Sequence, residues 1–192
     1  MDKTSQKIID VTMKLIKEKG YVATTTIDIA NGSHINECTI FRKFKGKKDI
    51  VLSGMKQEKW CANVSASIFQ DVKWDLQLDL EMFMRNYLER ITPDFVSLSV
   101  GLRAPQIYED TMPYIMKIPE AFLQTLVLYF KSMNEKGKIG TFDFECLAMT
   151  IFSSTFGFTF LKASFGEQLS RVKQEEYITN SVSLFLKGIQ HE

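Results

Sequence analysis

Residues 7–50 constrain the fold most, because they contain three short helical patterns separated by turn signals. In the first pattern, apolar side chains such as Ile8, Ile9 and Ile16 recur at helical spacing, and charged residues lie between them. Gly20 follows, and glycine commonly ends a helix. The sequence therefore predicts a first amphipathic helix that ends at about residue 19.

Two further short helices are predicted beyond this point. Thr25 and Asp28 form a Ser/Thr-x-x-Asp capping pattern, which opens a helix. Residues 32–35 are too few and too polar for anything but a turn, and Asn36 can then cap a third helix over residues 37–43. That helix would be roughly 12 Å long at 1.5 Å per residue. The major groove of B-DNA, about 12 Å wide, admits such a helix.

A dense run of cations follows the third pattern and suits the phosphates at a groove edge. Its members are Arg42, Lys43, Lys45, Lys47 and Lys48. Residues 1–48 contain ten Lys or Arg and five Asp or Glu, whereas the remainder contains 14 and 18. A basic end on a mildly acidic body is typical of a helix-turn-helix protein that approaches DNA with one end only.

The ordered run of residues in this segment resembles the TetR family of bacterial transcriptional regulators, at the family's spacing and without a gap. The matching residues are Gly20-Tyr21, Thr24-Thr25, Asp28-Ile29-Ala30, Ile35, Thr39-Ile40-Phe41-Arg42, Phe44, Lys47 and Asp49-Ile50. The resemblance implies an all-α fold. It would comprise an N-terminal three-helix helix-turn-helix DNA-binding domain over residues 1–47, with the motif at about 25–44, and a C-terminal helical ligand-binding and dimerisation domain over residues 48–192.

The resemblance also implies which side chains contact DNA. Those expected at base edges or the adjoining backbone are Asn36, Glu37, Cys38, Thr39 and Arg42. Those expected on the phosphate side are Thr25, Thr26, Phe41, Lys43 and Lys47. The alternative for Lys45, Lys47 and Lys48 is a merely solvated surface. Glu37 is unusual beside phosphates, but its carboxylate can accept a hydrogen bond from a cytosine amino group.

Three departures from the family pattern affect the motif. Ser33-His34 stands where the family usually has Ala-Gly, so His34 is expected at positive φ, which His tolerates better than most residues. Phe41 replaces a preferred Tyr and lacks the hydroxyl that usually reaches a phosphate. Cys38 stands where a small residue is common and could alter which base edge is read.

The rest of the chain shows helical patterns and no strand-like alternation between hairpin signals. Helices are expected at about 47–70, 74–91 and 94–109, then up to about 135 after an entry punctuated by Pro113 and Pro119, and finally at 142–165 and 173–189. Residues 142–165 are apolar nearly all round, so this helix is expected to be buried on most sides.

The last two helices are expected to form a homodimer interface, because in the family they pair with their mates as a four-helix bundle. The candidate residues are Phe152, Phe156, Gly157, Phe160, Ile178, Val182, Phe185 and Ile189. The alternative is that these side chains are ordinary monomer core. A two-fold dimer would place two heads one helical turn apart, roughly 34 Å, and read a palindromic operator in double-stranded DNA.

The body between these parts is rich in large, adaptable side chains, which either line a largely apolar ligand cavity or simply fill the core. The candidate pocket residues are Phe83, Met84, Tyr87, Phe95, Leu98, Leu102, Arg103, Met112, Tyr114, Met116 and Phe122. That a cavity for a small-molecule effector exists is implied mainly by the family resemblance.

Several other classes of protein are disfavoured. The odd number of widely spaced cysteines, with no C-x-x-C pair, argues against a zinc site or a disulfide framework, and no metal or cofactor is predicted. The N-terminus has no signal-peptide pattern and the longest uncharged run, 146–161, is short for a span, so a cytoplasmic protein without a membrane partner is expected. No catalytic motif appears, which leaves a helical enzyme as a remote alternative. The main alternative is a DNA-binding regulator, either a repressor or an activator, that is controlled by a protein partner in place of a small ligand.

Overall fold

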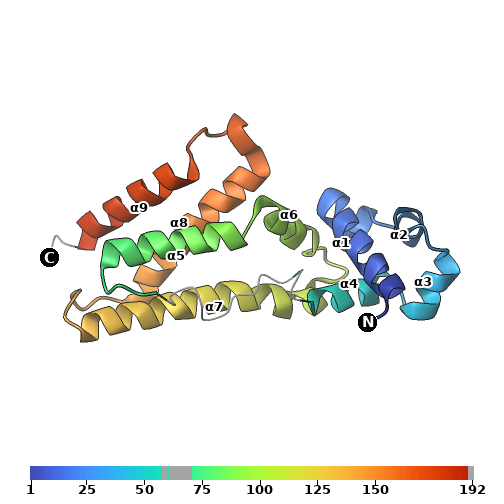
Figure 1. Cartoon of the computed structure of the whole chain (residues 1–192), viewed down its shortest axis with the longest axis horizontal. Helices are drawn as coiled ribbons and strands as arrows, with labels where there is room; N and C mark the ends of the chain where they lie inside the picture. The colour runs from blue at the N-terminus through green and yellow to red at the C-terminus, as the bar shows by residue number, and fades with distance from the viewer. Residues whose placement is uncertain (58–59, 61–70, 190–192) are drawn as a thin grey trace. The chain divides into compact units, whose positions relative to one another are not determined.

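The computed structural model describes residues 1–57, 60 and 71–189, and every regular element in these residues is helical (Figure 1). The helices are α1 (Lys3–Ala23), α2 (Thr26–Ser33), α3 (Glu37–Lys43), α4 (Lys47–Met55), α5 (Leu76–Arg90), α6 (Pro93–Gly101), α7 (Tyr108–Glu135), α8 (Phe144–Phe165), the 3-10 turn η2 (Gly166–Gln168) and α9 (Gln174–Ile189). The predicted all-α class is confirmed for this part of the chain.

The chain forms two compact units that are each discontinuous in sequence. The first consists of Met1–Asn63 and Asp94–Lys117, and the second of Val64–Pro93 and Ile118–Glu192. The first unit thus contains the predicted head together with α6 and the start of α7. The division at residues 47 and 48, which concerns function, stays a prediction.

The core of the first unit is built from one apolar face of each short helix. Ile8, Ile9, Met13 and Ile16 of α1 are fully buried, and α2 and α4 pack against this helix. The remaining members of the cluster come from the end of α1, from α2, α3 with its C-terminal cap, α4 and the segment 98–107; they are Tyr21, Ile29, Ile40, Phe44, Ile50, Val51, Met55, Leu98, Leu102 and Ile107. A cluster of this size stabilises the short helices α2, α3 and α4, which would not be stable singly.

Two predicted helices differ from the structure. The expected helix over 94–109 is wrong, because α6 ends at Gly101 and a turn follows, where the Thr111 hydroxyl bonds to the carbonyl oxygen of Leu102 at 2.8 Å. The helix expected over 47–70 ends as α4 at Met55, and residues 58–59 and 61–70 lie outside the described part.

Helix α7 runs through Pro113 and Pro119, which were expected only to precede a helix. An interior proline costs about 3 kcal/mol because it removes one backbone hydrogen bond and crowds the preceding turn. The buried stripe of Phe122, Leu126 and Phe130 lies on the same helix with no exposed surface, and its burial offsets that cost.

The second unit packs α5, the later part of α7, α8 and α9 around an aromatic core. The Tyr87 ring lies 4.5 Å from that of Phe122 and 5.7 Å from that of Phe152. α9 packs against α5, where Arg85 and Glu175 form an exposed ion pair of 2.7 Å. These contacts join helices that are far apart in sequence.

A buried carboxylate, not anticipated from sequence, organises the start of α5. Asp79 has no exposed surface; its carboxylate accepts hydrogen bonds from the Lys73 amide at 2.7 Å and from the Tyr129 hydroxyl at 2.9 Å. Burial is the main cause that raises the pKa of the Tyr129 phenol, and the hydrogen bond to Asp79 raises it further. Trp74, at a positive φ of 57°, stacks on Tyr129 and lies beneath the Lys136 ammonium.

Helix α8 is not buried on most sides, so that expectation is wrong for a single chain. Met149, Phe160, Leu161 and Phe165 are all well exposed. Judged only by length and composition, the segment Phe144–Gln168 could also cross a membrane. The same composition suits a helix whose open apolar faces are covered by a second copy of the chain.

Candidate nucleic-acid interface

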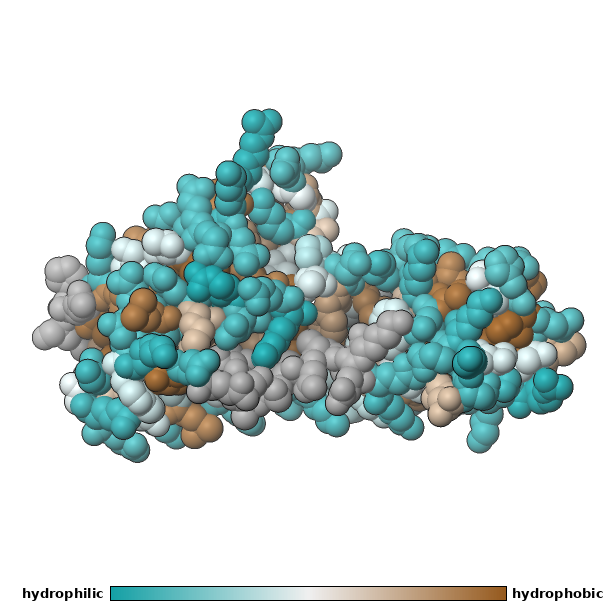
Figure 2. Space-filling model, in the orientation of Figure 1, coloured by the Kyte–Doolittle hydropathy of each residue, from teal (hydrophilic) through white to brown (hydrophobic). Residues whose placement is uncertain are grey.

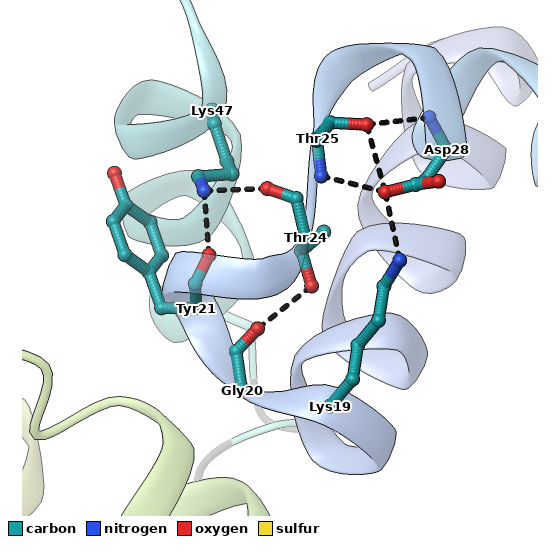
Figure 3. A network of polar contacts seen from close by, with 7 residues as sticks. All are labelled: Lys19, Gly20, Tyr21, Thr24, Thr25, Asp28 and Lys47. Carbon is teal, nitrogen blue, oxygen red and sulfur yellow. Dashed lines mark hydrogen bonds and ion pairs between the residues drawn. The ribbon is translucent and has the colours of Figure 1, made fainter.

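Helix α2 begins with the capping box that its sequence predicts. The Asp28 amide donates to the Thr25 hydroxyl at 3.1 Å, and the Thr25 amide donates to the Asp28 carboxylate at 2.8 Å. Lys19 adds an ion pair to the same carboxylate at 2.7 Å (Figure 3). The hydrogen bonds from Lys19 and Thr25 hold the pKa of Asp28 well below its usual range, so this start of the helix stays charged.

The turn between α2 and α3 accommodates both departures at Ser33-His34. His34 adopts the left-handed conformation, with φ 53° and ψ 41°, as expected. The Ser33 side chain is fully buried and its hydroxyl donates to the carbonyl oxygen of Ile29 at 2.6 Å. The Ile35 amide then bonds to the carbonyl of Ala30 at 3.0 Å, which closes the turn.

Helix α3 is short and is held by both its ends. The Asn36 side chain caps it by accepting from the Cys38 amide at 2.8 Å, as predicted. Ile40 and Phe44 are buried in the core of the first unit, at 0% and 7% exposure. Anchoring on this face leaves the opposite face of α3 to solvent.

An open concave surface of about 750 Å³ lies between α2 and α3. Its lining residues come from both helices and the turn; they are Ile27, Ala30, Asn31, His34, Ile35, Asn36, Glu37 and Cys38. Three of the side chains predicted at base edges, Asn36, Glu37 and Cys38, are therefore brought together here. Ile27 was not singled out by the sequence reasoning, although its place in the first turn of α2 was available as a signal.

The other predicted DNA residues differ in the exposure of their side chains and in their contacts within the chain. Phe41 is 54% exposed and Arg42 is also exposed on α3. Lys43 forms an ion pair of 3.1 Å with Asp2, which caps α1. The remaining three have partly or largely accessible side chains around the helix ends; they are Thr25, Thr26 and Thr39.

Lys47 is the predicted DNA residue whose surroundings differ most from expectation. Its ammonium donates to the carbonyl oxygens of Tyr21 and Thr24 and lies 4.0 Å from the centroid of the Tyr21 ring (Figure 3). Burial lowers the pKa of this ammonium. In this structure Lys47 joins the start of α4 to the end of α1, a role that its predicted phosphate contact did not foresee.

Contacts within the first unit also tie the head helices to residues 94–117. Lys17 and Asp94 form an ion pair at 2.8 Å, and Lys48 pairs with Asp110. Gly101 approaches α1 so closely that a Cβ atom at this position would lie 2.8 Å from the carbonyl oxygen of Ile16. Residues 94–117 therefore form part of the body that presents α3.

The predicted pocket residues fall into both compact units. Phe83, Met84, Tyr87 and Phe122 belong to the second unit and are buried against one another as core. The others belong to the first unit; they are Phe95, Leu98, Leu102, Arg103, Met112, Tyr114 and Met116, of which Leu98 and Leu102 lie in its core cluster. A ligand pocket formed by these residues stays a prediction.

The predicted dimer residues on α8 and α9 have unequal access to solvent. Ile178 and Val182 have no exposed surface and belong to the chain's own core, which leaves no surface for a second copy. Phe152, Phe156 and Phe160 stack in succession along α8, and Phe160 is exposed. The rest lie in between: Gly157, Phe185 and Ile189 are partly accessible.

A partly open pocket of about 330 Å³ lies beside the turn between α8 and α9, next to these residues. It is mostly apolar and is lined by Ser154, Gly157, Phe158, Leu161, Lys162, Gly166, Leu169, Ser170, Val172 and Tyr177. The Tyr177 hydroxyl donates to the Ser154 carbonyl at 2.6 Å, which ties the two helices together beside it.

No metal-binding group of three or more His, Cys, Asp or Glu side chains occurs in residues 1–57, 60 and 71–189. Cys38 and Cys146 are exposed free thiols there.

Comparison with known proteins agrees with this geometry. Residues 8–53 match the model for bacterial regulatory proteins of the tetR family. The chain is 32% identical over 189 residues to the uncharacterized HTH-type transcriptional regulator YvkB of Bacillus subtilis, covering 98% of both chains. It is 24% identical to IcaR of Staphylococcus aureus, named a negative transcriptional regulator of the biofilm operon icaADBC, over 94% of this chain and 98% of IcaR.

Solved structures with a similar fold include another transcriptional regulator. The structure of FadR from Bacillus subtilis in complex with stearoyl-CoA superposes with a TM-score of 0.70 at 18% identity, covering 96% of this chain and 99% of FadR. The named relatives are regulators and not enzymes, which removes the remote enzyme alternative. A capped, exposed α3 on a matching head and full-length similarity to YvkB together mean that this chain, a DNA-binding transcriptional regulator, belongs to the TetR family.

Proposed function

We propose that the protein is a homodimeric repressor that binds a palindromic operator in the cytoplasm and is released from it by a small, largely apolar ligand. The observation on which this rests is α3, which is anchored by Ile40 and Phe44 and exposes its opposite face beside a concave surface. The name of IcaR as a negative regulator supports the sign of regulation, and the stearoyl-CoA in FadR supports the class of ligand.

The dimer is supported by α8. Its side chains Phe160, Leu161 and Phe165 are exposed in the single chain. Covering them with a second chain would remove a large apolar area from water, which stabilises the dimer. A two-fold dimer would supply two copies of α3, one for each half of a palindromic operator.

The dimer can be tested by sedimentation. The variant Phe160→Asp should be monomeric at concentrations where the natural chain is a dimer, because a carboxylate would be buried without a partner. Leu128→Asp, on an exposed position of α7, is the matched control and should leave the dimer intact. Equal masses for the natural chain and Phe160→Asp would contradict an interface on this face.

Release by a ligand requires that the ligand prefers a dimer with a different spacing of heads. To change a site from mostly bound to mostly free, the ligand must favour the released state by several kcal/mol. The ion pairs Lys17–Asp94 and Lys48–Asp110 support this scheme, because they join residues 94–117 to α1 and α4, which lie in the same compact unit as α3. A shift of this segment would therefore reorient the head.

The decisive experiment is fluorescence anisotropy with DNA that flanks the protein's own gene, over a series of salt concentrations and with scrambled DNA as control. Sequence-dependent binding of two chains per site is expected. Addition of a long-chain acyl-CoA or of the free fatty acid should then lower the affinity. Binding no tighter than to scrambled DNA would refute an operator beside the protein's own gene, and unchanged affinity with both compounds would refute this class of ligand.

A protein partner in place of a small ligand is the second candidate. It is favoured by Leu128 and Leu184, which are 64% and 71% exposed and lie outside α8. If this candidate holds, operator affinity responds to no apolar small molecule but does respond to a partner that loses its effect with Leu184→Asp.

A further inference from the structure

Ile27 is an exposed apolar side chain in a head whose other isoleucines are largely core. Its side chain is 60% exposed, whereas Ile29, two positions along the same helix, is completely buried. Residues i and i+2 lie on different faces of a helix, so Ile29 lies on the face of α2 that packs against α1 and Ile27 lies on another face. Burial within the chain therefore does not explain an isoleucine at position 27.

Ile27 lies on the same concave surface as the start of α3. That surface combines apolar groups, from Ile27, Ala30 and Cys38, with hydrogen-bonding groups from Asn36 and Glu37. In Figure 2, brown apolar atoms likewise reach the surface among teal ones over the part of the chain that forms α1–α4. Such a mixture suits a ligand that offers both a methyl group and amino or carbonyl groups within a few ångströms.

The charge around this surface selects the ligand. Exposed Arg42 and Lys45 lie on and just after α3, so the occupant is expected to be a polyanion. On the major-groove edge of an A·T pair the 5-methyl group of thymine is the apolar feature, and the adenine amino group lies on the same edge, beyond the thymine O4. Glu37, an acceptor, matches that amino group, and Ile27 matches the methyl group.

We propose that Ile27 is a specificity-determining residue that contacts the methyl group of a thymine in each half of the operator. This inference rests on the proposed binding of an operator by α2 and α3. Contact between the Ile27 side chain and the methyl group removes one methyl-sized apolar surface from water, which corresponds to about a fourfold change in affinity.

The test pairs a change in the protein with a change in the DNA. The operator is first obtained by selecting bound duplexes from a randomised pool with the natural chain. Each thymine is then replaced singly by deoxyuridine, which removes only the methyl group, and the dissociation constants of the natural chain and of Ile27→Ala are measured by anisotropy. One thymine position per half-site should lose about fourfold in affinity with the natural chain and nothing with Ile27→Ala.

Val22→Ala is the matched control, since Val22 is 64% exposed in the same unit and does not line the concave surface. This variant should retain the full response to deoxyuridine. The proposal is overturned if no thymine responds to deoxyuridine, or if the response persists unchanged in Ile27→Ala. Failure of the randomised pool to yield any preferred sequence would instead refute operator recognition by this head, and the role of Ile27 with it.

Discussion

Replacing Lys47 by alanine should lower the free energy of unfolding of the head. Loss of a direct DNA contact should be the smaller effect. The change removes an ammonium that bonds to the carbonyl oxygens of Tyr21 and Thr24 and covers the Tyr21 ring. Hydrogen bonds from a charged group contribute about 1.5–3 kcal/mol, and a cation over an aromatic ring about 0.5–2 kcal/mol, depending on how far the pair is desolvated. Partial burial, which lowers the pKa of Lys47, offsets some of this gain.

The expected loss is therefore about 2 kcal/mol in the free energy of unfolding. Urea unfolding followed by circular dichroism measures it, and hydrogen exchange at the α1–α2 junction locates it. Lys45→Ala is the matched control, because Lys45 is exposed and its loss should cost less than about 0.5 kcal/mol.

The salt dependence of DNA affinity distinguishes this bracing role of Lys47 from a phosphate contact. A lysine that only neutralises a phosphate would leave stability unchanged and reduce the slope of log affinity against log salt by about 1 when it is removed. If Lys47→Ala unfolds at the same urea concentration as Lys45→Ala and loses that slope, the bracing role assigned to Lys47 is refuted.

Two further predictions concern the close contact at Gly101 and the buried phenol. Gly101→Ala should cost about 1–3 kcal/mol, since its Cβ would press on the Ile16 carbonyl, whereas Gly188→Ala, with open space around it, should cost nothing in a urea titration. The raised pKa of Tyr129 means that the folded state keeps a proton that the unfolded chain loses near pH 10, so the unfolding free energy should fall above about pH 10. Tyr129→Phe should make that fall smaller, and an identical fall in both proteins would show that Tyr129 ionises normally.

The head could be predicted from sequence because its boundaries depend on local chemistry. The capping box at Thr25 and Asp28, the cap at Asn36 and the left-handed His34 each involve residues within a few positions of one another. A pattern of neighbouring residues is sufficient to specify such features.

The features that sequence did not predict depend on partners far along the chain. The carbonyls that hold Lys47 lie 26 and 23 positions away, and Asp79 meets Tyr129 across 50 positions. Pro119 lies inside α7 because the packing of this helix outweighs the local tendency of proline to interrupt a helix. Composition showed that α8 is apolar, but it could not tell whether the chain itself covers that surface.

The membership of Asp94–Lys117 in the first unit has a consequence for how the protein is made and reused. Leu98, Leu102 and Ile107 complete the apolar cluster that α1–α4 begin, so a ribosome must release residues beyond 107 before the head can close. A chimera that grafts only residues 1–57 onto a foreign body would leave that side of the cluster open to water. The portable DNA-reading module of this protein is therefore a split one, and its two pieces must be transplanted together.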